Sequence, residues 1–467
     1  MKKFSFAAIL LMVAAIASCS KDGIQEDTNH LSLAPDLSSG IDPDVTDISE
    51  NDAIKVALMS QHQSKTKSEI QKEVQNIIPC IGKDGKVVFY AINYTNGCGY
   101  TLISASKNYY PILAEVEKGS FEENVNQTGV SILLDEYKYA IDNNRSLPYD
   151  SVKLYRSFWR DFETKNVLTI NTKSEGDEFP EFIASSIEQW QSEGYEIYEL
   201  GYSAPEGLPQ DIYQNWCSIA ETIANDNPSE FAAFILYKKE RTSTERGPLL
   251  TTKWDQEPPY NLSVPQGIDV GCVAVAVGQI MRFHRWPQRF DWSNMPDTLS
   301  STETRPTTVS DFLYDFGLKC GIQYWLKLTG SDSFLASHAL KFYYDYSCDR
   351  ISHSHSKVYS EIMSGNPVYM EGYRSSFKGH AWVCDGVRHS EVNEKYEFRT
   401  ISNLGGYPLH FESPSEPYKT SSDGFTHFYM NWGWGGDYNG WYLDDLRHYD
   451  QNYSIKRKDI IKIRPKK

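Results

Sequence analysis

A single cysteine stands directly after a glycine and at the start of a run of small apolar residues, GCVAVA at 271–276. Apolar residues then recur at helical spacing until Pro287, so a helix of mainly small residues is predicted to begin at Cys272. Free backbone N–H groups and the positive end of the helix dipole stabilise a thiolate at that position. The segment therefore favours a nucleophilic Cys272, although a buried structural cysteine would fit the same residues.

Length and charge restrict the class of protein. With 467 residues, the chain is long enough for two or three domains with full-sized cores. Its formal net charge of −16 argues against a nucleic-acid partner, which would normally require a basic face. None of the 8 cysteines forms a CxxC pair, so a zinc site is not expected.

The N-terminus predicts export. Residues 1–18 read as a signal peptide, because two lysines precede an apolar core that is too short to span a membrane. The Ile-Ala-Ser-Cys sequence at 16–19 resembles a bacterial lipobox, in which Cys19 would become the lipid-bearing first residue; a chance cysteine after an ordinary signal would also fit. Residues 19–51 are predicted to form a flexible tether. We expect the chain to be anchored at the bacterial outer membrane or cell surface, with release after processing as an alternative.

Two regions precede the segment that contains Cys272. Residues 52–141 are predicted to form a small α+β domain, with a helix at 52–64, strands at 87–93, 100–104 and 112–117, and a helix at 128–141. Residues 142–246 are predicted to contain helices near Trp159 and at 187–193 and 212–224, with no assigned function. The charged stretch 238–247 is predicted to be an exposed linker that a protease could cut.

The remaining residues, 247–467, show helices first and strands afterwards, which indicates a two-lobed α+β domain with a cleft between its lobes. The expected helices lie at 308–316 and 333–343, and the expected strands at 368–373, 380–387, 397–401, 426–432, 440–443 and 460–463.

A cysteine nucleophile needs a base, and two further segments supply candidate partners. His380 opens the sequence GHAWVCDGV, whose glycine leaves room for an approaching chain and whose apolar strand would fix the imidazole ring; a core or surface histidine would also fit. Asn431 opens NWGWGG, and its side-chain oxygen could accept from the imidazole while neighbouring indoles such as Trp432 exclude water. An aromatic turn or a sugar-binding platform would explain that segment as well.

Together, GCVAVAVGQIMRFHRWP, GHAWVCDGV and NWGWGG resemble the three active-site segments of the streptopain family of papain-like cysteine peptidases. The resemblance implies Cys272 as the nucleophile, His380 as the acid and base, and Asn431 as the orienting residue, with Trp432 shielding it.

A fourth segment, WDQEPPYNL at 254–262, is similar to the part of that family that begins the mature enzyme and carries its oxyanion-hole glutamine. The resemblance implies Gln256 as the oxyanion donor, with Gln266 as a competitor for the role. Residues 88–121 are similar to the streptopain-type propeptide, which implies that 52–141 block the cleft; an adhesion or partner-binding module is the alternative. His380 and Asn431 lie farther apart than in streptopain itself, so an insertion at about 390–423 is expected near the cleft rim.

The sequence thus predicts a papain-like two-lobed peptidase domain at 247–467, preceded by an inhibitory α+β propeptide domain and, at 142–246, a propeptide extension with its processing linker. The predicted protein is a secreted, lipid-anchored cysteine endopeptidase zymogen that acts on proteins or peptides through an acyl-enzyme, without a metal or organic cofactor. One rival is a non-catalytic protease-inhibitor or binding lipoprotein that keeps the fold. Another is an acyl or glutamyl transferase that uses the same cysteine and histidine.

Overall fold

The computed structural model describes residues 40–64, 72–122, 128–164, 178–201, 204–205, 207–226, 231–327, 329–375, 378–402, 410–413, 415–419, 423–444 and 457–466. The predicted signal peptide, Cys19 and most of the predicted tether lie outside these residues. In the part of the chain that the structure describes, no helix is both long enough and apolar enough to cross a bilayer.

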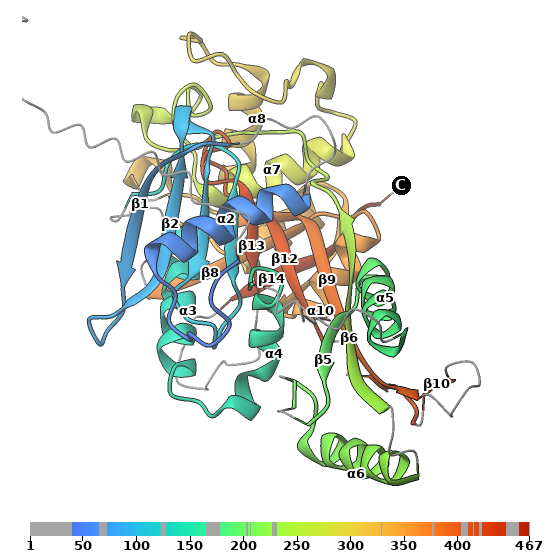
Figure 1. The fold of residues 1–467 in the computed structure, drawn as a ribbon. Helices are drawn as coiled ribbons and strands as arrows, with labels where there is room; N and C mark the ends of the chain where they lie inside the picture. The colour runs from blue at the N-terminus through green and yellow to red at the C-terminus, as the bar shows by residue number, and fades with distance from the viewer. Residues whose placement is uncertain are drawn as a thin grey trace, which may run out of the picture. The chain divides into compact units, whose positions relative to one another are not determined.

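The N-terminal region forms an antiparallel sheet with helices packed beside it, shown in blue and teal in Figure 1. Its elements are α2 (Glu50–Ser64), β1 (Val74–Ile81), β2 (Val87–Tyr94), η1 (Thr95–Gly97), β3 (Tyr100–Ser104), β4 (Ile112–Val116), α3 (Thr128–Asn144) and α4 (Tyr149–Trp159). The helices and three strands predicted at 52–141 are confirmed. Strand β1 was missed because it is a half-exposed edge strand that contains Pro79, so it lacks a regular apolar alternation.

The C-terminal region contributes one helical lobe and one sheet lobe. The helical lobe contains η2 (Pro265–Gly267), α7 (Cys272–His284), η3 (Trp292–Asn294), α8 (Thr308–Lys319), η4 (Tyr324–Leu326) and α9 (Ser333–Tyr343). Its core forms around α7, because Val273, Val277 and Ile280 are all buried against residues of α8 and α9. The sheet lobe contains β7 (Tyr346–Ser352), α10 (His355–Met363), β8 (Val368–Ser375), β9 (Lys378–Ser402), β12 (Asp423–Asn431), β13 (Gly440–Leu443) and β14 (Lys458–Pro465).

The two regions share one sheet, in the order β1-β2-β3-β4-β13-β12-β9-β8-β14-β7 (Figure 1). The junction is antiparallel, with Trp441 of β13 opposite Glu115 of β4 and Tyr442 opposite Ala114. One cluster of buried side chains extends across this junction from Leu102 to Trp382. The predicted mixed α+β class is confirmed.

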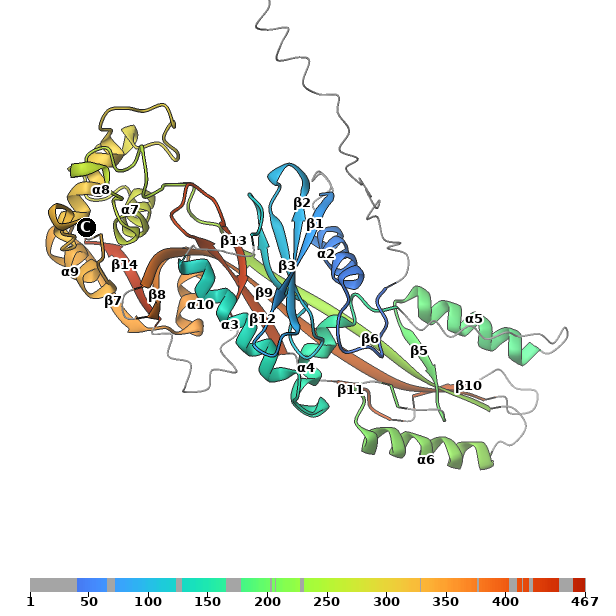
Figure 2. The same cartoon turned by 90° about the vertical axis from the view of Figure 1, so that its left-hand side faces the viewer.

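A long two-stranded ribbon extends from the sheet, formed by β6 (Phe231–Arg246) and residues 387–402 of β9. Helices α5 (Glu178–Ser192) and α6 (Gln210–Asp226) lie on its two sides, and the short strands β5 (Glu196–Glu199), β10 (His410–Glu412) and β11 (Tyr418–Lys419) pair along it (Figure 2). Successive side chains of a strand point to opposite faces, which explains why both sides of the ribbon are covered. Phe234 and Leu236 pack with α5, whereas Ile235 and Tyr237 pack with α6.

The ribbon corrects one expectation. The stretch 238–247 was predicted to be a linker, but residues up to Arg246 belong to β6 and pair with β9 through Arg246 and Val387. Residues 240–246 are exposed, as predicted, but they are hydrogen-bonded in a strand. Residues 390–402 of the predicted insertion belong to β9 and form the other strand of this ribbon.

Candidate active site

Cys272 is the first residue of α7, as predicted. Its N-cap, Gly271, has a φ of 92°, and a Cβ there would lie 2.9 Å from the carbonyl oxygen of Thr329, so only glycine fits. Burial raises the pKa of the Cys272 thiol, while the backbone N–H groups of Ala381 and Val273 oppose that rise. The helix start supplies N–H donors for a thiolate, but the thiol is the favoured form in this state.

His380 lies on β9, where only 5% of its surface is exposed. Its Nε2 lies 2.8 Å from the carbonyl oxygen of Trp432 and 3.1 Å from the indole nitrogen of Trp434. Because a carbonyl can only accept, the shorter contact needs the proton on Nε2, which leaves a lone pair on Nδ1; the Trp434 contact is a hydrogen bond only in the other tautomer. Burial lowers the pKa of His380 to about 4, so the ring is neutral near pH 7.

No hydrogen bond links Asn431 to the His380 ring in this state, contrary to the sequence-based expectation. The Nδ2 of Asn431 donates to the carbonyl of Thr252 at 2.9 Å and to Oε1 of Gln279 at 3.2 Å, and its Oδ1 accepts from Gln279 and from the N–H of Gly433, both at 3.2 Å. The main-chain carbonyl of Trp432 takes the acceptor position that was assigned to Asn431. The amide of Asn431 instead ties β12 to α7 through Gln279, a fully buried residue that the sequence did not single out.

Trp432 lies beside the histidine, as its predicted shielding role requires. Its ring centroid is 6.2 Å from that of His380 and 5.0 Å from that of Trp382, and 1% of its surface is exposed. Trp434, which the sequence placed only in the general motif, meets the His380 ring edge-on at 5.0 Å. Aromatic side chains therefore enclose one side of the imidazole.

The position of the oxyanion glutamine stays a prediction. Gln256 is half-buried, and its carbonyl accepts from the N–H of Val270 at 3.0 Å, so its backbone lies against the segment that leads into Cys272. The side chain of the competitor, Gln266, lies outside what the structure describes.

The N-terminal region reaches this site through α3. A Cβ at Gly129 would lie 2.6 Å from Cδ2 of His380 and 2.6 Å from Cζ3 of Trp432, so the helix backbone rests on both rings. Farther along α3, the Tyr137 hydroxyl donates to the carbonyl of Leu443 at 2.8 Å. The Gly129 contact adds to the burial of His380, and burial lowers the pKa of the ring.

The cysteine and the histidine are not paired in this state. Between Cys272 and His380, both fully described, no hydrogen bond links thiol and ring, and the ring's Nε2 is engaged with Trp432 and Trp434. In the described part of the chain, no group of three or more His, Cys, Asp or Glu side chains is placed to hold a metal. The seven cysteines within that part are free thiols. The geometry is that of a thiol and an imidazole with no hydrogen bond between them, and α3 packs against the imidazole.

Two protein-family models match the chain. The peptidase C10 family matches residues 254–290 and 288–442, which include Cys272, His380 and Asn431. The Spi protease inhibitor family matches residues 46–141, which include most of α3.

The individual relatives have low sequence identity to this chain. The thiol protease/hemagglutinin PrtT of Porphyromonas gingivalis is 29% identical, over 51% of this chain and 28% of that protein. Streptopain of Streptococcus pyogenes is 24% identical, over 41% of this chain and 54% of streptopain. A mutant fragment of prointerpain A from Prevotella intermedia has a TM-score of 0.45 and 17% identity, covering 84% of this chain and 100% of the fragment. The chain spans about half the length of streptopain and less of PrtT.

The matched segments contain the cysteine at the helix start, the histidine on the central strand and the aromatic turn beside it. The chain therefore contains a peptidase C10 (streptopain family) domain, preceded by a Spi-type inhibitor region.

Proposed function

We propose that this chain is the latent form of a cysteine endopeptidase that cleaves protein substrates. The observation that carries the proposal is the contact of α3 with His380 and Trp432, because it covers part of the ring that we assign as the base for Cys272. A helix from a Spi-type region on the catalytic histidine is what an autoinhibited zymogen requires. The rival non-catalytic lipoprotein gives no reason for a cysteine at a helix N-terminus in the same domain.

The chemistry follows from the two groups once α3 has moved away. When its Nε2–H donates to the carbonyl of Trp432, the His380 ring has a lone pair on Nδ1. This lone pair can take the proton of the Cys272 thiol. The thiolate then attacks the peptide carbonyl, and the imidazolium returns its proton to the leaving amine, which gives a thioester. Water, deprotonated by the same ring, hydrolyses the thioester. Charge on the tetrahedral oxygen would be stabilised by the N–H of Cys272 and by Gln256.

The thiol test compares the latent and released states. We expect iodoacetamide to modify Cys272 slowly at pH 7 in the full chain, because its raised pKa leaves little thiolate. After the N-terminal region is removed by an added protease, modification should become at least ~10-fold faster, since His380 can then accept the proton. Mass spectrometry of the labelled Cys272 peptide measures both rates, with glutathione added to both samples as the reference thiol. Equal rates in the two states would count against the proposal.

We also propose that the chain is exported and lipid-anchored through Cys19. The support is the sequence at 16–19 together with the polar stretch that follows it. We expect Cys19→Ser to move the protein from the detergent phase to the aqueous phase in Triton X-114 partitioning, because a single acyl chain contributes about 0.8 kcal/mol per buried CH₂. A variant that still enters the detergent phase would contradict lipidation at this residue.

A further inference from the structure

The ribbon carries a pocket that is built around a guanidinium group. Arg160, at the end of α4, places Nη1 2.9 Å from Oε1 of Glu394, 3.1 Å from the hydroxyl of Tyr396 and 3.2 Å from the hydroxyl of Tyr237. Its guanidinium carbon lies 5.4 Å from the centroid of the Tyr237 ring. A carboxylate, two hydroxyls and an aromatic ring therefore converge on one cation.

The pocket residues also contact one another. Tyr237 donates to Oε1 of Glu394 at 2.8 Å, and the Tyr237 and Tyr396 rings lie 4.9 Å apart across the paired strands β6 and β9. Glu394 is 6% exposed, so its carboxylate is largely removed from water. One wall is the backbone of Gly207, where a Cβ would lie 2.9 Å from Nη2 of Arg160. Glycine at 207 leaves room for the guanidinium, and the several acceptors around it suit the forked donors of arginine better than the single ammonium of lysine.

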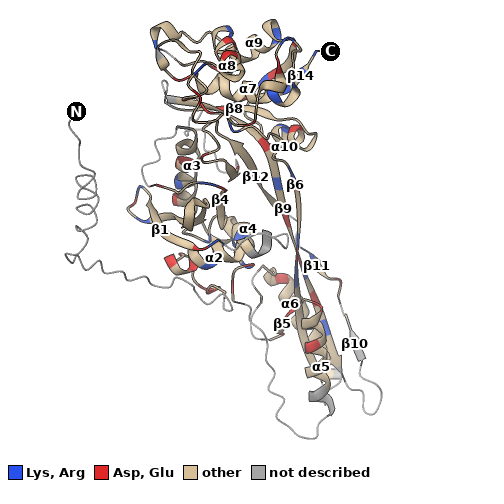
Figure 3. Cartoon of the chain, turned by 90° about the horizontal axis from the view of Figure 1, so that it is seen from above, with Lys and Arg blue, Asp and Glu red and all other residues tan. Residues whose placement is uncertain are grey.

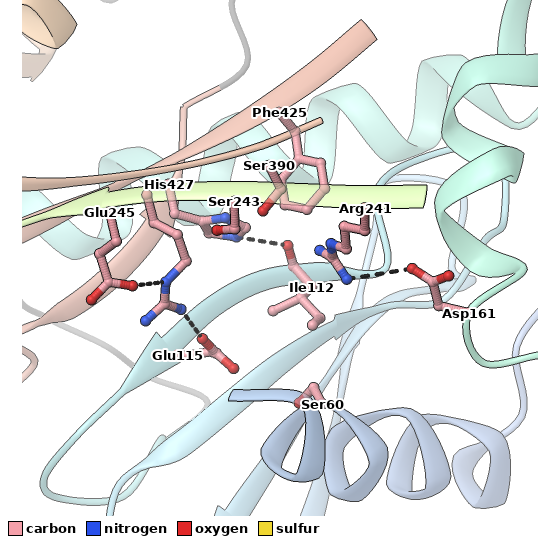
Figure 4. Close-up of a pocket in the computed structure, with 11 residues that line it drawn as sticks. Ser60, Ile112, Glu115, Asp161, Arg241, Ser243, Glu245, Ser390, Phe425 and His427 are labelled. Carbon is pink, nitrogen blue, oxygen red and sulfur yellow. Dashed lines mark hydrogen bonds and ion pairs between the residues drawn. The ribbon is translucent and has the colours of Figure 1, made fainter. Parts of the chain in front are cut away.

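Asp161, which follows Arg160, anchors the end of α4 beside this pocket. Asp161 lies 2.9 Å from Nζ of Lys239 and 3.4 Å from Nη1 of Arg241, both on β6, and Figure 4 shows the Asp161–Arg241 pair. The pair lines a cavity of about 510 Å³ where α2 and β4 face β6, β9 and β12 (Figure 4). Figure 3 shows that charged residues recur along β6 and β9. The ribbon thus holds the N-terminal region by charge, at a place separate from His380.

A second cavity, of about 490 Å³, opens next to Arg160 and gives access to the pocket. It is lined by α4 residues, by the loop at 207–210 and by Glu394. Neither α4 nor β6 lies within the residues that the two family models match, whereas Glu394 and Tyr396 of β9 lie within the peptidase C10 match. The pocket takes no part in the mechanism proposed for Cys272 and His380.

We propose that Glu394, Tyr237 and Tyr396 form an arginine-recognition site, which the latent chain fills with its own Arg160. When α4 is displaced, the site takes an arginine side chain presented by a partner protein, so that an arginine-bearing partner competes with the closed state. The proposal does not depend on catalysis by Cys272.

Chemical rescue tests the site, with all variants made in the full chain carrying Cys272→Ala to prevent processing. Arg160→Ala removes the buried ion pair of Arg160 with Glu394, so we expect the Tm of the variant to fall by about 5 °C. Methylguanidinium chloride at ~20 mM should restore at least about half of that loss, whereas methylammonium chloride should not. In the double variant Arg160→Ala/Glu394→Gln, methylguanidinium should not raise the Tm. Lys118→Ala, which removes an exposed ion pair with Asp437, is the matched control and should not respond to it.

Competition tests the arginine-bearing partner. In the chain with Cys272→Ala alone, Nα-acetyl-arginine amide should speed hydrogen exchange of the α4 amides at least ~3-fold, and the lysine analogue should leave it unchanged. Arg160→Ala should show fast exchange without the probe. Equal rescue by methylammonium, rescue that survives Glu394→Gln, or equal exchange with both amino-acid amides would overturn the proposal.

Discussion

Replacing Cys272 by alanine is expected to abolish peptide cleavage and any self-processing of the full chain. The variant keeps the helix start, the N–H donors and His380, but it has no atom that can form the thioester. Removal of a catalytic nucleophile typically costs about 10⁶-fold in turnover, so the remaining rate should lie at the detection limit. Hydrolysis of a fluorogenic peptide after removal of the N-terminal region, and mass spectrometry of the incubated full chain, measure the two activities.

The control for Cys272→Ala must separate loss of chemistry from loss of fold. Cys320→Ala removes another buried thiol of the same helical lobe, which contacts the Ser331 hydroxyl at 3.0 Å. That change should cost about 1–3 kcal/mol of stability and leave hydrolysis per folded molecule intact. Peptide cleavage that persists in Cys272→Ala would remove the basis for the proposed nucleophile.

The local pattern of apolar residues was sufficient to predict the helix and the strand that carry the site. The small-residue run after Gly271 became α7, and the apolar strand after His380 became β9, because each segment is buried and its periodicity reports that burial. The charged half of β6 was misread because residues 240–246 are all exposed and polar. A strand that is exposed on both faces shows no alternation of apolar and polar residues.

The contacts of the site were less predictable than its members. Asn431 was assigned to the imidazole because the residue types suited each other, yet its amide bonds to Gln279, and a main-chain carbonyl takes its place. Main-chain acceptors leave no signature in a sequence, since every residue has one. The contact of α3 with His380 joins segments from two separate regions, and only the family resemblance pointed to it.

Gly129→Val is expected to open the latent state. A Cβ at this position would overlap His380 and Trp432, two buried rings in contact with other aromatic side chains, so α3 must shift outward. Valine gains little helix propensity over glycine, and overpacking of this kind typically costs about 1–3 kcal/mol. That cost corresponds to a roughly 5- to 150-fold larger open fraction, and the lag before self-processing should shorten in proportion. The lag is measured by following the full-length band at several protein concentrations.

The same substitution at Gly330 separates release of the histidine from general destabilisation. A Cβ there meets no atom within 4 Å, so Gly330→Val should keep the wild-type lag although it lies in the peptidase domain. In Gly129→Val, iodoacetamide should also reach Cys272 faster, because the freed His380 can take the thiol proton. If Gly129→Val lengthened the lag or left Cys272 as unreactive as in the wild type, α3 would not be the element that holds the enzyme latent. The Spi-type region would then have to inhibit through its sheet, where β4 pairs with β13.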